Sequence, residues 1–313
     1  MNITALGIDI GGTKTAAALV APDGRVSHYQ SVATPAVAGA EAIMAAAVTL
    51  GQRVLQAAHA QGVEVAALGV GTAGHVDRQR GAISYASGTL PGWSGVAVAQ
   101  ELQDALGLPV SVDNDVNALA IGEGRFGAGH DFRDVLYITV GTGVGGALVF
   151  DGQMRRGATW TAGELGHLVI DWDGKRRCSC GHLGHLEGYT SGPAIVAYYC
   201  ALAAVHEPCD LQLVAARARN GDAYAQRAIA ESAQVLGLTL GGLLNVIDPQ
   251  ALIVGGGVTE LGDPWWQPFV AALRANPMPG PARIAVLPAQ LGQHAVLIGA
   301  AWLALCEHAA MGH

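Results

Sequence analysis

Short apolar segments separated by glycine-rich turns recur along the chain, and they predict buried β-strands. Residues 6–20 hold two such segments on either side of the turn Gly11-Gly12-Thr13-Lys14, and a Pro-Asp-Gly turn follows the second segment. Residues 135–150 repeat this order around Gly141-Thr142-Gly143, again before an Asp-Gly turn. The recurrence of strand, glycine-threonine turn and strand indicates a duplicated fold.

The rest of the chain alternates between segments with helical spacing and further buried strands. Helices are expected over residues 39–59, 96–106, 191–205 and 222–246, after residue 118, and at the C-terminus. Further strands are expected over residues 63–70 and 109–112, and residues 251–258 are expected to hold a buried strand that runs into a triple-glycine turn. Strands that alternate with helices in this way predict an α/β fold with parallel strand pairs.

The composition is that of a compact globular protein. Of the 313 residues, 51% are hydrophobic and 13% are charged, which excludes a disordered chain and suffices for two domains with substantial cores. The net charge is −8, and the longest basic run, Lys175-Arg176-Arg177, is interpreted as a solvated loop. No nucleic acid and no anionic membrane surface is therefore expected as a partner.

The cellular location follows from three further features. The N-terminus has no signal-peptide pattern, and the longest apolar run, near residues 235–247, is shorter than a membrane span requires. The five cysteines form no disulfide framework. We expect a cytoplasmic protein without a membrane partner.

The two glycine-threonine turns are predicted phosphate cradles. Gly11 and Gly12 let backbone N–H groups approach an anion, and Thr13 and Lys14 add donors and positive charge. A strand rather than a helix follows each turn, which excludes a Walker A loop and a dinucleotide-binding turn. Asp9 ends the first strand and either holds Mg²⁺ through water or caps the turn. Two cradles on a duplicated fold predict a bound nucleoside triphosphate.

Two further strand ends carry candidate binding residues. The run Gly255-Gly256-Gly257 follows a buried strand, and only glycine lets a backbone lie closely against a nucleoside face. Gly74 follows the strand at residues 63–70, and strand ends of this kind bind ligands in open α/β sheets. Both are therefore included in the predicted site.

A dense polar cluster, Asp113-Asn114-Asp115-Val116-Asn117, follows the strand at residues 109–112. An ordinary helix cap needs only one of these polar side chains. The cluster therefore predicts a site, and Asp115 is the candidate general base.

Cysteine and histidine are concentrated in one segment, where His167, Cys178, Cys180 and His185 supply the four nitrogen and sulfur ligands that tetrahedral Zn²⁺ prefers. We call the segment Cys178–His185 the clip; His167 would close its metal site from a distance. Four protein ligands leave no position for water, so the zinc would be structural. The alternative is a pair of free thiols on a surface loop with histidines nearby.

Two carboxylates flank these ligands. Glu164 and Glu187, together with the second face of His167, are suited to accept hydrogen bonds from sugar hydroxyls. The alternative is that both glutamates lie in solvent, as most glutamates do.

Together these motifs resemble the ROK family (repressor, open reading frame, kinase) of sugar kinases, within the actin and hexokinase superfamily. The resemblance covers nearly the whole chain in family order and rests on Asp9-Ile10-Gly11-Gly12-Thr13-Lys14, Asn114-Asp115, Gly141-Thr142-Gly143, Glu164-Leu165-Gly166-His167, residues 178–187 and Gly255-Gly256-Gly257. It implies two ribonuclease-H-like α/β domains with a cleft between them. Residues 1–112 with 300–313 would form the first domain, and residues 113–299 with the zinc loop would form the second.

The resemblance also implies an activity, which is ATP-dependent phosphoryl transfer to the 6-hydroxyl of a hexose, most often glucose. Asp115 would take the hydroxyl proton, and the sugar would contact Asn114, Gly74, Glu164, His167 and Glu187. Asp9 would contact the phosphates through Mg²⁺. The phosphates would also contact the first turn (Gly11, Gly12, Thr13, Lys14) and the second turn (Gly141, Thr142, Gly143). Adenosine would contact Gly255, Gly256 and Gly257. A homodimer or tetramer is implied as well.

Two positions depart from the family pattern. His185 stands where the family clip usually has a third cysteine, so zinc with two thiolates would form a neutral site. Thr89 stands where glucokinases of the family commonly place a sugar-contacting asparagine, which keeps an N-acetylmannosamine or N-acetylglucosamine kinase as the alternative. A repressor would need a DNA-binding domain ahead of Asp9. A non-catalytic sugar-binding regulator would be expected to lack Asp115 or one of the turns.

Overall fold

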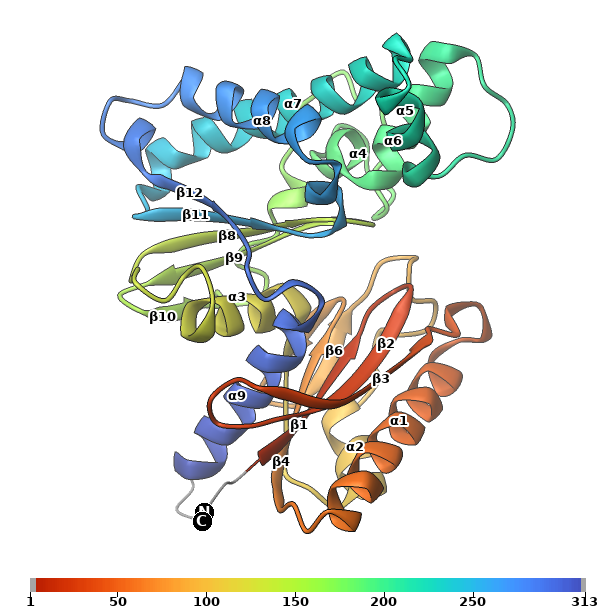
Figure 1. Cartoon of the computed structure of the whole chain (residues 1–313), viewed down its shortest axis with the longest axis vertical. Coiled ribbons are helices and arrows are strands. Elements are labelled where there is room, and N and C mark those ends of the chain that lie inside the picture. Colours follow the sequence, from red (N-terminus) through yellow and green to blue (C-terminus); the bar gives the residue numbers. More distant parts are fainter. Residues whose placement is uncertain (1–3, 311–313) are drawn as a thin grey trace. The chain divides into compact units, whose positions relative to one another are not determined.

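The computed structural model describes residues 4–310, which form two compact units (Figure 1). Unit 1 comprises the described residues up to Asp131, the segment Met154–Ala162 and the residues from Ala289 onward. Unit 2 comprises Phe132–Gln153 and Gly163–Pro288. The chain therefore leaves and re-enters each unit, and the short segment Met154–Ala162 belongs to unit 1 although unit 2 residues flank it on both sides.

Unit 1 is built on a five-stranded sheet in the order β3-β2-β1-β4-β7. Its strands are β1 (Thr4–Ile10), β2 (Lys14–Val20), β3 (Val26–Ala33), β4 (Val65–Thr72) and β7 (Val110–Asn114). The pairs β1–β2 and β2–β3 are antiparallel, whereas β1–β4 and β4–β7 are parallel. The unit also contains a small hairpin of β5 (His75–Asp77) and β6 (Ala82–Tyr85), and the helices α1 (Ala40–Ala60), α2 (Val98–Leu106), α3 (Asp115–Phe126) and α9 (Ala295–Ala310).

Side-chain alternation along β1 assigns its two faces to different helices. Leu6 and Ile8 point into the core that the sheet shares with α1 and α2. The other face carries glycine because α9 lies directly against it. A Cβ atom on Gly7 would lie 2.5 Å from the carbonyl oxygen of Leu297, and one on Gly69 would lie 1.9 Å from that of Ala300. Figure 1 shows the result, with α9 from the end of the chain beside β1 from its start.

Unit 2 has a second five-stranded sheet, in the order β10-β9-β8-β11-β12. Its strands are β8 (Val135–Val140), β9 (Val144–Phe150), β10 (Gln153–Arg155), β11 (Ala251–Gly255) and β12 (Ala285–Pro288), and of β10 only Gln153 groups with unit 2. The pair β8–β9 is antiparallel, and β8–β11 and β11–β12 are parallel. The helices are α4 (Glu187–Thr190), α5 (Gly192–Ala203), α6 (Leu211–Arg219), α7 (Ala223–Ile247) and α8 (Asp263–Ala275).

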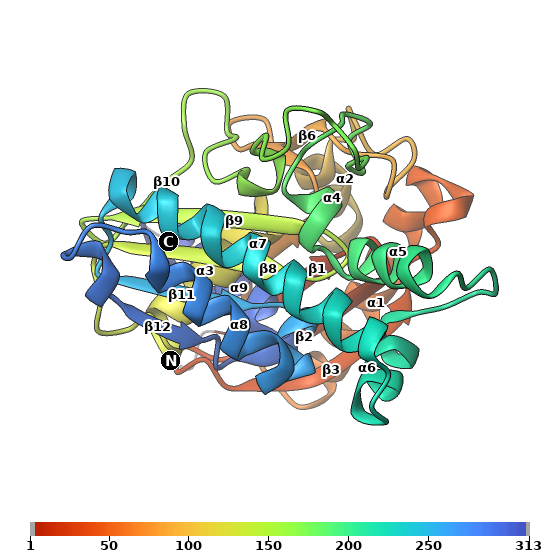
Figure 2. The ribbon, with the colours of Figure 1, turned by 90° about the horizontal axis from the view of Figure 1, so that it is seen from above.

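Helices α7 and α8 pack closely on each other in unit 2 (Figure 2). Two glycines one turn apart on α7 permit this, since a Cβ atom on Gly237 would lie 2.3 Å from the Phe269 carbonyl oxygen and one on Gly241 would lie 2.6 Å from that of Leu273. Among the helices of residues 4–310, only α7 is long and apolar enough to cross a membrane. Its buried residues, such as Leu236 and Leu240, pack into the core of unit 2, which is the pattern of a core helix.

In each sheet the central strand, β1 or β8, pairs antiparallel with the strand that follows it in the chain, and two parallel pairs lie on its other side. The predicted α/β class and duplication are therefore confirmed. The helices expected over 39–59, 96–106, 191–205 and 222–246 are present as α1, α2, α5 and α7. The helix expected after residue 118 already begins at Asp115, because Asn114 caps it. The domain limits 1–112 with 300–313 and 113–299 stay a prediction; by its contacts α3 groups with unit 1.

Candidate active site

Three parallel strand ends in unit 1 bring predicted site residues together. In the register of the sheet Ile10 lies opposite Thr72, and Thr72 lies opposite Asn114. The chain leaves these three positions at the same edge of the sheet, toward the glycine turn, Gly74 and Asp115 respectively. Ligands of open α/β sheets bind at such carboxyl ends.

The first glycine turn, Gly11 to Lys14, is held in shape by hydrogen bonds of its own. The Gly11 N–H donates to the carbonyl oxygen of Lys14 at 3.0 Å. The Thr34 hydroxyl donates to the Gly11 carbonyl oxygen at 2.7 Å, and the Thr34 N–H donates to the Thr13 carbonyl oxygen at 3.0 Å. Lys14 extends its ammonium group to 3.5 Å from Gln293 Oε1. The turn is therefore preformed, with one lysine charge at its end.

Asp9 carries the largest electrostatic perturbation near this turn. Burial and the neighbouring negative charge of Asp115 raise the pKa of Asp9 to about 7, against the opposing effect of Lys14. A bound cation would lower this pKa by stabilising the carboxylate form. The raised value therefore fits a position prepared for positive charge.

Asn114 caps helix α3 and holds Gly74. Its Oδ1 accepts hydrogen bonds from the N–H groups of Val116 at 2.9 Å and Asn117 at 3.2 Å, while its Nδ2 donates to the Gly74 carbonyl oxygen at 3.1 Å. Asp115, the first residue of α3, accepts a hydrogen bond from Val116 N–H at 2.9 Å. The helix-cap and site interpretations of this cluster are thus compatible, because the cap fixes where the Asp115 side chain begins.

The second glycine turn borders a pocket within unit 2. The Gly141 N–H donates to the Gly143 carbonyl oxygen at 2.9 Å, and Gly192 N–H donates to the Gly141 carbonyl oxygen at 2.8 Å. The pocket has a volume of about 950 Å³ and is lined by Gly141, Thr142, Gly192, Pro193, Val196, Ala197, Cys209, Asp210, Leu211, Gln212, Ala215, Arg219, Gly257, Val258, Glu260 and Leu261. Apolar walls with a few polar groups at this volume are typical of small-molecule sites.

The third glycine run has mixed roles. Gly255 pairs with Thr139 of β8. Gly256 has a φ of +93°, and a Cβ atom placed on it would lie 2.4 Å from the Val140 carbonyl oxygen. Gly256 is thus required for packing against β8. Gly257, by contrast, lines the pocket, and a Cβ atom placed on it would meet no neighbouring atom within 4 Å. Of the predicted nucleotide residues in unit 2, the pocket brings together Gly141, Thr142 and Gly257, whereas Gly143, Gly255 and Gly256 are not among its lining residues.

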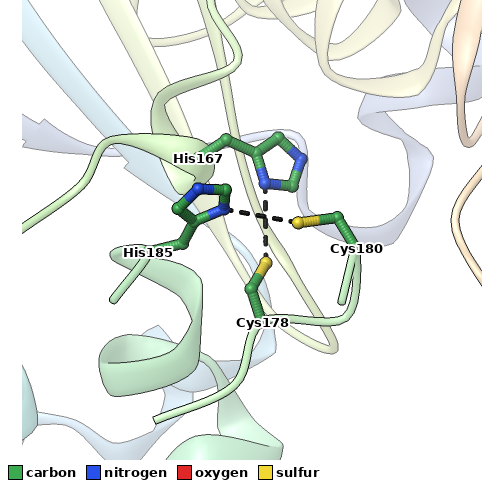
Figure 3. A group of neighbouring side chains, drawn as sticks. All are labelled: His167, Cys178, Cys180 and His185. Atoms are coloured by element: carbon green, nitrogen blue, oxygen red, sulfur yellow. Dashed lines mark hydrogen bonds between the residues drawn. The ribbon is translucent and has the colours of Figure 1, made fainter. Parts of the chain in front are cut away.

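The four predicted metal ligands converge (Figure 3). The ligand atoms of His167, Cys178, Cys180 and His185 all lie within 4.8 Å of one another. His167 Nδ1 is 3.5 Å from Cys178 Sγ, and His185 Nδ1 is 3.3 Å from Cys180 Sγ. Tetrahedral zinc bonds of usual length would separate a nitrogen and a sulfur ligand by about 3.6 Å. The donor set and its spacing therefore fit zinc.

Electrostatics around the clip favour the same interpretation. Burial, with the neighbouring imidazoles of His167 and His182, lowers the pKa of His185, so its ring is neutral as a metal ligand must be. Burial raises the pKa of the Cys178 thiol to about 12. At neutral pH this thiol keeps its proton; a bound metal cation would displace the proton to solvent and hold the sulfur as a thiolate.

Glu187 contacts the clip, and Glu164 contacts His167. Glu187 is buried and accepts hydrogen bonds from Cys178 Sγ at 3.1 Å and Ser179 N–H at 3.2 Å through Oε1, and from Val144 N–H at 3.1 Å through Oε2. Although burial alone would raise it, these hydrogen bonds lower the pKa of Glu187. Glu164 Oε2 lies 3.6 Å from Nε2 of His167. Carboxylates in such positions orient metal ligands.

Comparison with known proteins identifies the chain's relatives. A profile of the ROK family matches residues 5–307. The chain belongs to the ROK family. It is 36% identical to a glucokinase of Streptomyces coelicolor, over 97% of this chain and 98% of that protein. It is also 33% identical to an N-acetylmannosamine kinase of Salmonella heidelberg, over 96% and 98% of the two chains.

The fold is also similar to that of a ROK sugar kinase. The structure of a ROK glucokinase from Streptomyces griseus in complex with glucose and AMPPNP superimposes with a TM-score of 0.86 at 36% identity, covering 97% of this chain and 99% of that one. This ROK protein therefore has the actin/hexokinase-like α/β fold that the sequence predicts.

Three features of this ROK protein are not evident from its sequence. His182 lies within the clip beside two predicted metal ligands, with its Nδ1 3.5 Å from Cys180 Sγ and its ring stacked on His185. Arg176 was expected in solvent, but its guanidinium lies 4.1 Å from the Tyr198 ring centroid and 4.8 Å from that of Tyr189. That expectation is wrong for Arg176, because two aromatic faces offer a cation a favourable partner. The third feature is the buried carboxylate of Asp113, whose two arginine partners are distant in sequence.

Proposed function

We propose that the chain is an ATP-dependent hexose kinase, which transfers the γ-phosphoryl group of ATP to the 6-hydroxyl of a hexose. The observation that carries this proposal is the row of strand ends in unit 1, where Asp9 with the first glycine turn, Gly74 and Asp115 follow parallel strands in register. Phosphoryl transfer needs alignment and charge neutralisation more than covalent chemistry, and these groups supply both. The sugar kinases at 33% and 36% identity support the assignment.

The residues of unit 1 carry the chemistry in this proposal. Asp115 accepts the proton of the 6-hydroxyl as that oxygen bonds to the γ-phosphorus and the bond to ADP breaks. Asn114 and Gly74 bind neighbouring sugar hydroxyls. Mg²⁺, which Asp9 would hold through water, neutralises phosphate charge when bound. The turn from Gly11 to Lys14 holds phosphate oxygens.

The residues of unit 2 bind the nucleoside and the far side of the sugar. The pocket of about 950 Å³ takes adenosine, with Gly257 at one wall and Gly141 and Thr142 toward the phosphates. Its apolar wall residues favour a donor with a base to bury, hence ATP rather than inorganic polyphosphate. Glu164, His167 and Glu187 contact the sugar, and the carboxylate of Glu187 also supports the clip through the Ser179 N–H.

A structural zinc ion completes this proposal. His167 and His185 would bind it through Nδ1, and Cys178 and Cys180 through their thiolates. The ion would hold the clip, and hence Glu187 and His167, in one conformation. We further propose a homodimer or tetramer in the cytoplasm, where hexoses and ATP are available together.

Glucose is the proposed hexose, and an N-acetylhexosamine is the alternative that the Salmonella relative favours. Thr89 is exposed, and its hydroxyl lies 2.9 Å from that of Ser87. The experiment is ADP release with Mg·ATP over glucose, mannose, fructose, N-acetylglucosamine and N-acetylmannosamine. A clearly higher kcat/KM for glucose supports the glucokinase assignment. A higher kcat/KM for an N-acetylhexosamine instead identifies the enzyme as a kinase of amino-sugar metabolism. No turnover with any of the five would contradict the kinase itself.

The proposed base is tested separately with Asp115→Asn. The amide cannot accept the hydroxyl proton, so kcat should fall by roughly 10²–10⁴-fold while the sugar still binds in calorimetry. Asp131→Asn is the matched control, because the Asp131 side chain is 91% exposed and should leave kcat unchanged. A near wild-type kcat in the Asp115 variant would show that another group accepts the proton.

A further inference from the structure

In unit 1 an ionic cluster surrounds the buried carboxylate of Asp113, two residues before the proposed base. The Asp113 side chain is 2% exposed, and its Oδ2 lies 2.6 Å from Arg78 Nη1 and 2.7 Å from Arg156 Nη2. Arg156 Nε also donates to the same oxygen at 2.9 Å. Glu307 of α9 pairs with Arg78 and accepts a hydrogen bond from the Ser111 hydroxyl at 2.5 Å. Two carboxylates and two guanidinium groups thus balance in charge.

The second oxygen of Asp113 binds two residues that flank the base in sequence. Asp113 Oδ1 accepts a hydrogen bond from the Asn114 N–H at 2.9 Å and from Asn117 Nδ2 at 3.0 Å. Asn114 and Asn117 lie on either side of Asp115, at the cap and in the first turn of α3. One carboxylate therefore joins the two arginines to the backbone that carries Asp115, so a shift of Asp113 is transmitted to the base.

Arg156 reaches this carboxylate from a distant segment of the chain that also belongs to unit 1. It belongs to the segment Met154–Ala162, which groups with unit 1 although the chain on both sides belongs to unit 2. The same segment leads in sequence to Glu164, two residues beyond Ala162. The charge-assisted pair of Arg156 with Asp113 thus anchors, at the strand end of the base, the stretch of chain that precedes Glu164.

Stability alone is a weak reason for such a cluster. Burying an ion pair costs desolvation, and apolar side chains of similar volume often stabilise a fold as well or better. An orienting role has a stronger rationale, because reactions that depend on alignment lose about 10²-fold when a group shifts by 1 Å. Charged hydrogen bonds in a buried network restrict such shifts.

We propose that Asp113 is a positioning residue for phosphoryl transfer, held by Arg78 and Arg156, and that the Arg156 contact aligns the Asp115 strand end with the segment that leads to Glu164. The proposal rests on the proposed role of Asp115 as the base. It does not make Asp113 a catalytic residue, because Asp113 is placed to act through the backbone of Asn114 and α3.

The test compares Arg156→Met, Arg156→Lys and a control, Arg227→Met, which breaks the exposed pair of Arg227 with Glu231 on α7. Steady-state kinetics with the best hexose and Mg·ATP are measured with the melting temperature of each variant. Arg156→Met should lose at least tenfold in kcat, with KM for Mg·ATP within threefold of the wild type and a melting temperature close to that of the control. Arg156→Lys, which keeps the charge but not the two-nitrogen contact, should retain between a tenth and a third of the wild-type kcat.

Each outcome has one meaning. A kcat within twofold of the wild type in a folded Arg156→Met overturns the proposal while leaving the kinase assignment intact. If Arg156→Met does not fold, Arg156→Lys decides: a wild-type kcat overturns the proposal and a loss of at least threefold supports it. An Asp115→Asn variant that still turns over, or a wild type that phosphorylates no hexose, overturns the proposed function and this inference with it.

Discussion

The protonation of Asp9 should make the stability of the protein depend on pH in a way that Asp9→Asn removes. The pKa of Asp9 is raised from 3.8 to about 7 by burial and by the charge of Asp115. Between these two values the native state binds a proton at Asp9 that the unfolded state has released, so the contribution of Asp9 to the free energy of unfolding falls as pH rises. Below pH 4 the penalty is absent, and above pH 7 it is complete.

The size of the effect follows from the two pKa values. Relative to a group with equal pKa in both states, Asp9 should lower the free energy of unfolding by about 2 kcal/mol at pH 5 and by about 4 kcal/mol at pH 8. Substitution by asparagine removes the titration but also changes packing by an amount that does not depend on pH. The gain of Asp9→Asn over the wild type should therefore be larger at pH 8 than at pH 5, by about 2–3 kcal/mol.

Urea denaturation of the wild type and Asp9→Asn at pH 5 and pH 8, in buffer free of divalent cations and nucleotide, measures how this gain changes with pH. Asp23→Asn is the control, since the Asp23 side chain lies on the β2–β3 turn and is 66% exposed. It should show no pH-dependent gain. Asp9 keeps some contact with solvent, which screens its charge and reduces the effect. If the stability gain of Asp9→Asn over the wild type differs by less than about 1 kcal/mol between pH 5 and pH 8, the electrostatic account of this site is refuted.

Three further predictions concern packing, metal and substrate. Gly256→Ala should destabilise the protein by about 2 kcal/mol or more in urea denaturation, because the backbone has a φ of +93° and the new Cβ would lie 2.4 Å from the Val140 carbonyl oxygen; Gly257→Ala, with open space around it, should change stability little, and equal midpoints for the two would contradict this. Metal analysis should find zinc bound to the wild type, and Cys178→Ser should lower both the zinc content and the melting temperature; a full complement of zinc in that variant would exclude Cys178 as a ligand. Thr89→Asn should raise kcat/KM for glucose relative to N-acetylmannosamine, and an unchanged ratio would show that Thr89 does not discriminate between them.

The parts of the fold that could be predicted are those with strong local signals. The strands β1 and β8 and the helices α1 and α7 are apolar, periodic and bounded by glycine or by a capping residue such as Asp222. Helix α8 escaped prediction because Pro268 interrupts its pattern. Strand β3 escaped because it is an edge strand with no fully buried residue, so its alternation is weak.

The same distinction applies to the candidate site. The Cys/His cluster could be predicted because its ligands lie within 19 residues, counted from His167 to His185, and their chemistry is distinctive. The partners of Asp113 could not, because Arg78 and Arg156 lie 35 and 43 residues away in sequence. An arginine is as suited to solvent as to a buried carboxylate, and only the tertiary fold decides between them. The same reason explains the incorrect placement of Arg176.

The register of the first sheet explains how a packing requirement determines the position of the proposed site. Gly7 and Gly69 lie opposite each other on β1 and β4, and both must lack a side chain because α9 lies against them. The same register, three residues further along, places Ile10 opposite Thr72 and thus sets the first glycine turn beside the chain that leads to Gly74. A slip by one residue would bring side chains against α9 and would also turn Asp9 to the other face of the sheet. The contact of α9 with two glycines therefore selects the one alignment of β1 and β4 in which Asp9 and Asp115 are neighbours, and the chemistry at the strand ends depends on packing that lies entirely outside them.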